Sequence, residues 1–341
     1  MQTLPHAIDQ VDLRFDDAGL LALNVVLGLV MFGVALDLRV ADFRRVIARP
    51  RAPVVGLIAQ FVLLPAATYG LTLLLKPPPS IALGMILVAA CPGGNVSNFV
   101  THLAGGATAV SVSMTAVSTL AAVVMTPLNL ALWGGMRPGT AAILRSVELD
   151  PIAMLGTVAL ILAAPLAAGM TTAARWPALA ARMQRPFKAA SVAFFAIFVV
   201  VAFHKNFDHF LASIGFVFVP VLVHNSAAIA LGWTLSTATR LHPAERRAVA
   251  VEVGIQNSGL GLVLIFSYFA GLGGMAVVAA WWGIWHVIIG LSVAALWSRR
   301  PIPVHAGPMD APVPMHTGPT HTGPTQTGPT QAGGSNGDQS R

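Results

Sequence analysis

The sequence predicts an all-α polytopic membrane protein, and three observations lead to that fold class. Of the 341 residues, 55% are hydrophobic and only 10% are charged, whereas a soluble domain carries about 25% charged residues. Apolar runs long enough to cross a hydrocarbon core, which takes about 20 residues, recur along the chain. The basic residues gather in alternate loops between these runs, as the positive-inside rule describes.

These observations predict nine transmembrane spans. Their expected bounds are 17–36, 53–75, 81–103, 107–133, 152–171, 187–203, 210–237, 249–270 and 275–297. Fourteen lysines and arginines fall in the loops on one side of this arrangement, against five on the other. We therefore expect an extracytoplasmic N-terminus (1–16), a transmembrane transporter domain (17–298) and a cytoplasmic C-terminus, in a bacterial inner (plasma) membrane. Because the basic residues flank spans rather than forming one patch, nucleic-acid binding is excluded.

The first two spans are continuous apolar runs. Span 17–36 follows an acidic segment that lacks the basic region, short apolar core and cleavage site of a signal peptide. Span 53–75 carries the amide side chain of Gln60.

The third span is predicted to be broken. Pro92, Gly93 and Gly94 lie at mid-depth of 81–103 and are followed by polar residues, among them Asn95 and Ser97. Proline removes a backbone donor and clashes with the preceding turn, and glycine favours unwinding. Asn98 belongs to the same polar stretch.

The fourth span, 107–133, carries a stripe of hydroxyl groups. Ser111, Thr115 and Ser118 lie at positions i, i+4 and i+7, and therefore on one helix face. We interpret Ser111 and Thr115 as ligands, and Ser118 and Thr119 as residues that serve helix packing. The spans 152–171 and 187–203 are plain apolar runs.

The seventh and ninth spans carry isolated histidines. His224 and Asn225 lie in 210–237, where they either pack in the core or line a cavity. His286 lies in 275–297, where a packing role and a substrate-binding role stay open. Beyond the last span, residues 299–341 contain tandem HTGPT-like repeats and are predicted to form a disordered cytoplasmic tail.

The eighth span contains the most informative residue of the chain. Glu252 is a carboxylate within an apolar run, followed by Gly254, Gln256, Asn257 and Ser258. A charge at the bilayer centre costs about 2.5–3.5 kcal/mol on insertion scales, so an intramembrane acid indicates a functional site with a partner. Glycines and amides again predict a break, within 249–270.

Two broken helices in corresponding positions of two halves indicate a transporter built from inverted repeats, the first of which lacks its opening helix. Carboxylate, hydroxyl and amide oxygens suit a hard cation such as sodium. At each break the first half-helix should end in free carbonyls that attract cations, and the second should begin with free amides that attract anions.

Three separated motifs then match a known family in order and spacing. CPGGNVSN (91–98), AVSVSMTAVSTL (109–120) and VEVGIQNSGL (251–260) resemble those of the bile acid:sodium symporter family, and the similarity extends over about 21–297. The resemblance implies a panel domain and a core domain, with two crossed discontinuous helices in the core. It also implies two sodium sites and a substrate site. The first sodium site would use Ser97, Asn98, Ser111, Thr115 and Glu252; the second, Gln60, Glu252 and Gln256 with the main-chain oxygens of Val253 and Ile255; the substrate, Asn95, Asn257 and His286.

The expected function is sodium-coupled symport of an organic anion by alternating access, with two sodium ions per substrate. The anion would be bile-acid-like or a small carboxylate. The expected partners are the anion, sodium and the bilayer, with no cofactor beyond the coupling ions and no obligate protein partner. A proton-coupled or exporting carrier of the same fold, such as an arsenite-type carrier, is the alternative. An intramembrane enzyme is disfavoured, because the spans contain no HExxH or GxSxG motif.

Overall fold

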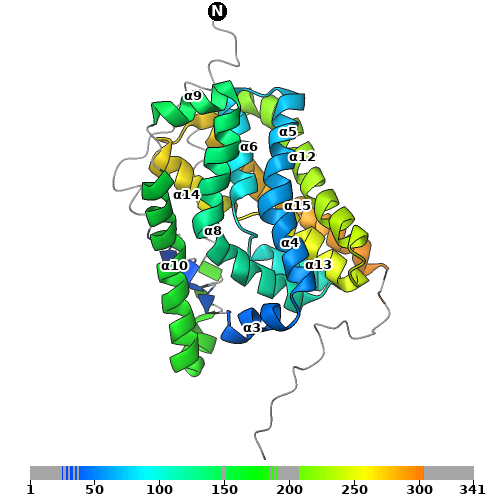
Figure 1. Ribbon diagram of the computed structural model, residues 1–341. Helices are drawn as coiled ribbons and strands as arrows, with labels where there is room; N and C mark the ends of the chain where they lie inside the picture. The colour runs from blue at the N-terminus through cyan, green and yellow to red at the C-terminus, as the bar shows by residue number, and fades with distance from the viewer. Residues whose placement is uncertain are drawn as a thin grey trace, which may run out of the picture. The chain divides into compact units, whose positions relative to one another are not determined.

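The computed structural model describes residues 25–300, except 26–27, 30, 34, 37, 148–150, 185, 188 and 191–206, together with residue 302. The described residues form helices joined by short connections (Figure 1). The elements are α3 (Val40–Ala48), α4 (Arg51–Ile58), the π-helical segment η1 (Ala59–Leu63), α5 (Leu64–Leu75), α6 (Pro79–Ala90), α7 (Val96–Leu103), α8 (Thr108–Met136), α9 (Pro138–Ser146), α10 (Pro151–Arg175), α12 (Phe207–Ala238), α13 (Pro243–Gly254), α14 (Ser258–Tyr268) and α15 (Gly273–Ser298).

Five of the described helices are long and apolar enough to cross a membrane. They are Arg51–Leu75, Thr108–Met136, Met154–Arg175, Gly215–Ala238 and Gly273–Ser298. They coincide with the predicted spans 53–75, 107–133, 152–171, 210–237 and 275–297. The prediction of a helical membrane protein is therefore confirmed for the part of the chain that the structure covers.

The two spans predicted to break are interrupted. The third forms α6 and α7, with residues 91–95 between them, and the eighth forms α13 and α14, with residues 255–257 between them. Helix α13 begins at Pro243, six residues before the predicted start of its span. The earlier start has a local cause, because the backbone N–H of His242 donates to Glu245 (3.0 Å) in a capping box.

The remaining predictions on organisation lie outside the described residues. Most of span 17–36, most of span 187–203, the N-terminal segment 1–16 and nearly all of the tail 299–341 belong there. The count of nine spans and the repeat relation therefore stay predictions. Within the described part, two helices appear in stretches expected to be loops, α3 and α9, and span 53–75 contains the π-helical segment η1.

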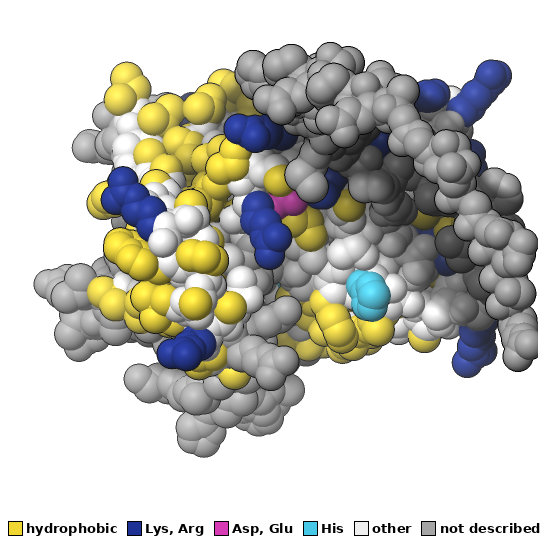
Figure 2. Space-filling view, turned by 90° about the horizontal axis from the view of Figure 1, so that it is seen from below, with side chains coloured by type: hydrophobic (Ala, Val, Ile, Leu, Met, Phe, Trp, Pro, Cys, Tyr) yellow, Lys and Arg dark blue, Asp and Glu magenta, His cyan; other side chains and the backbone are white. Residues whose placement is uncertain are grey.

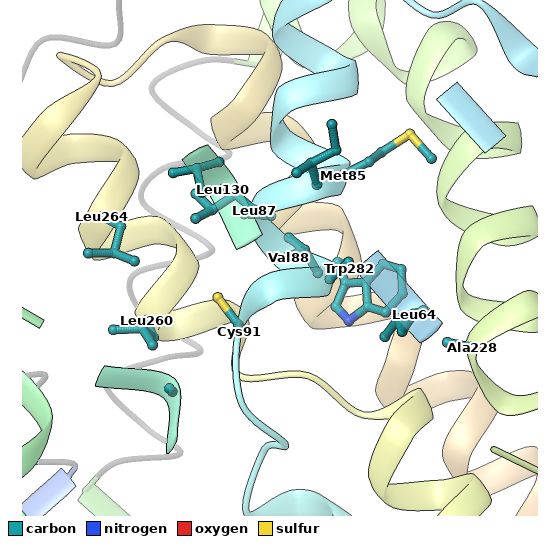
Figure 3. Packing of buried hydrophobic residues seen from close by; sticks show 14 of the residues in the cluster. Leu64, Met85, Leu87, Val88, Cys91, Leu130, Ala228, Leu260, Leu264 and Trp282 are labelled. Atoms are coloured by element: carbon teal, nitrogen blue, oxygen red, sulfur yellow. The ribbon is translucent and has the colours of Figure 1, made fainter. Parts of the chain in front are cut away.

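The core gathers around the end of α6. Side chains of α6, α8, α14 and α15 meet there, including Val88, Leu130, Leu260 and Trp282 (Figure 3). Cys91 is fully buried in this cluster, as expected of a small packing residue. Helix α6 is therefore enclosed by the other helices, since its residues from Ser80 to Ala90 are all buried, whereas α7 exposes Val96 and Phe99.

Candidate functional site

The two helix breaks lie against each other and pair through their backbones. Gly94 N–H donates to the Ile255 carbonyl (2.7 Å), and Asn257 N–H donates to the Pro92 carbonyl (2.8 Å). These bonds form an antiparallel β-bridge centred on Gly93 and Gln256. Unwound backbone inside a membrane must find partners in the protein. The pairing meets this requirement for residues of both breaks at once.

Side chains from the neighbouring helices hold the carbonyls at the ends of the first half-helices. Gln60 Nε2 donates to the Cys91 carbonyl (2.8 Å), and Thr126 Oγ1 donates to the Ala90 carbonyl (2.7 Å). Asn225 Nδ2 donates in the same way to the Gly254 carbonyl (2.7 Å). The sequence predicted free carbonyls at these positions, but these three already accept hydrogen bonds. A cation could use only their remaining lone pair.

The Glu252 carboxylate lies buried beside these paired breaks and accepts three hydroxyl hydrogen bonds. Ser97 Oγ (2.5 Å) and Ser111 Oγ (2.8 Å) donate to Oε2, and Thr115 Oγ1 (2.6 Å) donates to Oε1. Asn98 joins the group through its Oδ1, which lies 3.3 Å from Thr115 Oγ1. All five residues predicted for the first sodium site are thus brought together, although the sequence separates them by up to 155 positions.

No basic side chain balances this carboxylate within the described part of the chain, where the recorded ion pair joins Arg45 to Asp42. Burial of an unpaired carboxylate is costly even when it is hydrogen-bonded. Gly93 allows the close packing here, because a Cβ at that position would overlap Glu252 Oε1. The site therefore combines a negative charge, several oxygen atoms and room made by a glycine.

The residues predicted for the second sodium site are brought together in part. Gln60 Nε2 donates to Gln256 Oε1 (2.6 Å), and Gln256 Nε2 donates to the Val253 carbonyl (2.7 Å). The Ile255 carbonyl accepts the bond from Gly94. Gln60 Oε1 is buried and has no hydrogen-bond partner among the described residues. The recorded hydrogen bonds of the Glu252 carboxylate go to the first group rather than to these glutamines.

Two of the three predicted substrate residues, Asn95 and Asn257, belong to the breaks themselves, and the third, His286, lies on the neighbouring helix α15, with no recorded contact between the three in the described structure. Asn95 is half-buried and immediately precedes α7. Asn257 is half-buried and caps α14, because its Oδ1 accepts from Leu260 N–H (3.0 Å). His286 is buried on α15, one turn before Gly290, where a Cβ would contact Ile255 and Val100. That helix face is turned toward the breaks, although the two roles considered for His286 stay open.

Comparison with known proteins decides the family. Residues 24–213 match the model of the Sodium Bile acid symporter family. The chain is 33% identical over 282 residues to the uncharacterized sodium-dependent transporter YocS of Bacillus subtilis, covering 82% of this chain and 83% of that protein. The chain belongs to the sodium bile acid symporter family.

Two transporters from other organisms are also similar to the chain. The probable sodium/metabolite cotransporter BASS1 of Arabidopsis thaliana is 31% identical, with 81% of this chain and 66% of that protein aligned. The sodium-dependent organic anion transporter of Rattus norvegicus is 29% identical, with 80% and 72% aligned. Membership makes the chain a multi-pass membrane transporter of a sodium-dependent family rather than an enzyme, as the sequence predicted.

The contacts in the structure also indicate the roles of residues that the sequence left open or did not suggest. His224 is a core residue, since it bonds Thr68 Oγ1 (2.7 Å) and packs against the Trp282 ring with centroids 4.6 Å apart. Asn225 braces the end of α13. Ser118 and Thr119 donate to the Thr115 carbonyl of their own helix, in agreement with the packing role predicted for them.

The role of Thr126 was missed. A threonine in an apolar helix carries no sequence signal that distinguishes a bond within its own helix from one to a neighbouring helix.

Proposed function

We propose that this protein is a sodium-coupled symporter of an organic anion that works by alternating access. The observation that carries the proposal is the buried Glu252 carboxylate beside the two paired helix breaks. It accepts hydrogen bonds from three hydroxyl groups and has no recorded basic partner among the described residues. A hard monovalent cation supplies the missing charge and binds the same oxygens. The family membership and the sodium-dependent relatives support sodium as that cation.

The first proposed sodium site uses Ser97, Asn98, Ser111, Thr115 and Glu252. In the present arrangement three hydroxyl protons point at the carboxylate. When sodium enters, those hydroxyls turn their lone pairs toward the ion, which takes over the neutralisation of the carboxylate. Since these residues belong to α7, α8 and α13, sodium binding would fix both broken helices relative to the long helix α8.

The second proposed site uses Gln60, Gln256, Glu252 and the carbonyls of Val253 and Ile255. The unpartnered oxygen of Gln60 supports this site, because a buried acceptor without a donor is poised for a cation or a water molecule. Occupation of this site would require Glu252 to reach both ions, or the Gln60–Gln256 bond to open. Two sodium ions with one monovalent anion carry a net charge of +1, so transport is expected to be electrogenic.

The substrate site is proposed at the two helix breaks, with Asn95, Asn257 and His286. Asn257 uses its Oδ1 to cap α14, which leaves its Nδ2 as a donor for an anionic head group. The start of α14 adds the positive end of a helix dipole. The similarity to an organic anion transporter supports this substrate class.

The proposed architecture is nine spans in two inverted repeats, with the core and panel arrangement of the family. One local feature supports the repeat. In each half, an amide in the span before the broken helix donates to a carbonyl at the end of the first half-helix: Gln60 to Cys91, and Asn225 to Gly254. The orientation proposed has the N-terminus outside and the C-terminus in the cytoplasm, because α3 and the basic ends of α12, α13 and α15 lie at one end of the bundle (Figure 1).

The deciding experiment compares thermal stability of the detergent-purified protein in sodium chloride and in choline chloride. A ligand that binds only the folded state raises its stability by mass action. We expect sodium to stabilise the native chain and to lose this effect in Glu252→Ala. Sodium-driven uptake of candidate carboxylates and steroid-like anions into proteoliposomes then tests symport. A native protein indifferent to sodium, but stabilised as pH falls, would favour the proton-coupled alternative.

A further inference from the structure

Helix α3 directly precedes a helix that is long and apolar enough to cross a membrane. It ends at Ala48, and the span that follows begins at Arg51, so only two residues separate them. Figure 1 shows α3 across the lower end of the bundle, whereas α4 and α10 run along it. A helix that lies across the spans at their end occupies the head-group region of a bilayer.

The exposed face of α3 carries two apolar side chains and one arginine. Val40 is 55% exposed and Ile47 is 80% exposed, and exposed Arg44 lies on the same face, at i+4 from Val40. Phe43, at the edge of this face, packs against the cluster formed by Ala35, Leu38, Ala116 and Leu166, and Asp42, on the opposite side of the helix, is buried. A helix bathed in water would turn its β-branched residues inward, so the outer face is suited to lipid.

Asp42, the carboxylate of α3, is turned inward and paired. The exposed charges on α3 are therefore those of arginines. Asp42 is buried, accepts the Arg39 N–H (2.8 Å) and forms an ion pair with Arg45 (3.1 Å).

Two more basic residues flank this surface. Arg51 donates to the Thr239 carbonyl (2.7 Å) at the end of α12. This bond brings the neighbouring Arg240 to the same end of the bundle. Figure 2 views this end and shows Lys and Arg side chains over several parts of the face.

We propose that the α3 surface, made of Val40, Arg44 and Ile47 and flanked by Arg39 and Arg51, binds anionic phospholipid head groups. The two apolar side chains enter the upper acyl region while the guanidinium groups meet the lipid phosphates. Guanidinium groups pair well with phosphate oxygens because their N–H groups form a planar fork.

The test places a fluorophore on α3 and lets labelled lipids quench it. The variant Ile47→Cys is labelled with bimane in the full-length protein, because the native cysteine, Cys91, is fully buried. The labelled protein is placed in phosphatidylcholine nanodiscs that contain equal fractions of doxyl-labelled phosphatidylglycerol or doxyl-labelled phosphatidylcholine. We expect quenching by both lipids, and stronger quenching by the anionic one.

Charge variants separate a specific surface from general lipid contact. An arginine near an anionic bilayer surface contributes about 1 kcal/mol, or about a fivefold enrichment of anionic lipid. Adding Arg44→Gln should therefore reduce the preference for phosphatidylglycerol by up to about fivefold. Arg145→Gln, which removes an exposed arginine from α9 at the opposite end, should leave it unchanged. Absence of quenching, equal quenching by the two lipids, or equal effects of the two charge variants would each overturn the proposal.

Discussion

Gly93 offers a direct way to disturb the proposed sodium site without removing any of its ligands. The residue lies in the β-bridge opposite Gln256. A Cβ added there would overlap Glu252 Oε1 and lie 2.9 Å from its Cδ and 3.2 Å from its Cγ. The whole carboxyl end of Glu252 would have to move in Gly93→Ala. Since hydroxyls on α7 and α8 hold both carboxylate oxygens, movement must lengthen or break at least one of those bonds.

The expected size of the effect follows from these bonds. A hydrogen bond to a charged group contributes about 1.5–3 kcal/mol. If the free energy of sodium binding is reduced by the amount of one such bond, sodium affinity falls by about ten- to a hundredfold, because 1.4 kcal/mol corresponds to a factor of ten. The overpacking itself destabilises the fold by about 1–3 kcal/mol.

The assay is the melting temperature of the purified protein as a function of sodium concentration, with ionic strength kept constant by choline chloride. The half-maximal sodium concentration should rise at least tenfold in Gly93→Ala. The matched control is Gly135→Ala on α8, where an added Cβ would meet nothing within 4 Å. A monodisperse Gly93→Ala protein with native sodium dependence would refute the reasoning, as would an equal loss in the control.

Three further outcomes are expected. Thr115→Val removes the 2.6 Å hydrogen bond to Glu252 and should weaken sodium-induced stabilisation by about 1.5–3 kcal/mol. The control Ser118→Ala, which removes a hydroxyl that bonds within its own helix, should change that stabilisation by less than about 0.5 kcal/mol. Sodium titration of the melting temperature measures both. Asn225→Ala leaves the last carbonyl of α13 without its donor and should lower stability by about 1–3 kcal/mol with or without sodium, so a normal melting temperature would contradict the bracing role. Arg247→Gln should lower the melting temperature more than Arg299→Gln, because the buried Arg247 guanidinium donates to carbonyls at the ends of α7 and α15 (both 2.6 Å) while Arg299 is exposed.

Local chemistry explains why much of the fold could be predicted. A long apolar run has few options other than a transmembrane helix, and proline with paired glycines interrupts a helix whatever surrounds it. The breaks at 91–95 and 255–257 were therefore predictable from their own residues. Helix α3 and the early start of α13 were missed, because their charged residues resemble loop sequence until burial and capping are known.

In the candidate site, too, the amino-acid types were informative in the sequence, whereas the partner atoms were not. Amino-acid types alone determined that Glu252 needs a partner, and hydroxyl spacing determined that Ser111 and Thr115 share a face. Only the tertiary structure decided that Gly93 makes room for the carboxylate, and that Gln60, Thr126 and Asn225 occupy the carbonyls at the breaks. Periodicity specifies which face of a helix is polar, but the partner atom on another helix depends on packing between segments that lie far apart in the sequence. The prediction that Glu252 needs a partner was therefore determined by amino-acid types, and the arrangement of hydroxyl groups around its carboxylate was decided by how the helices pack.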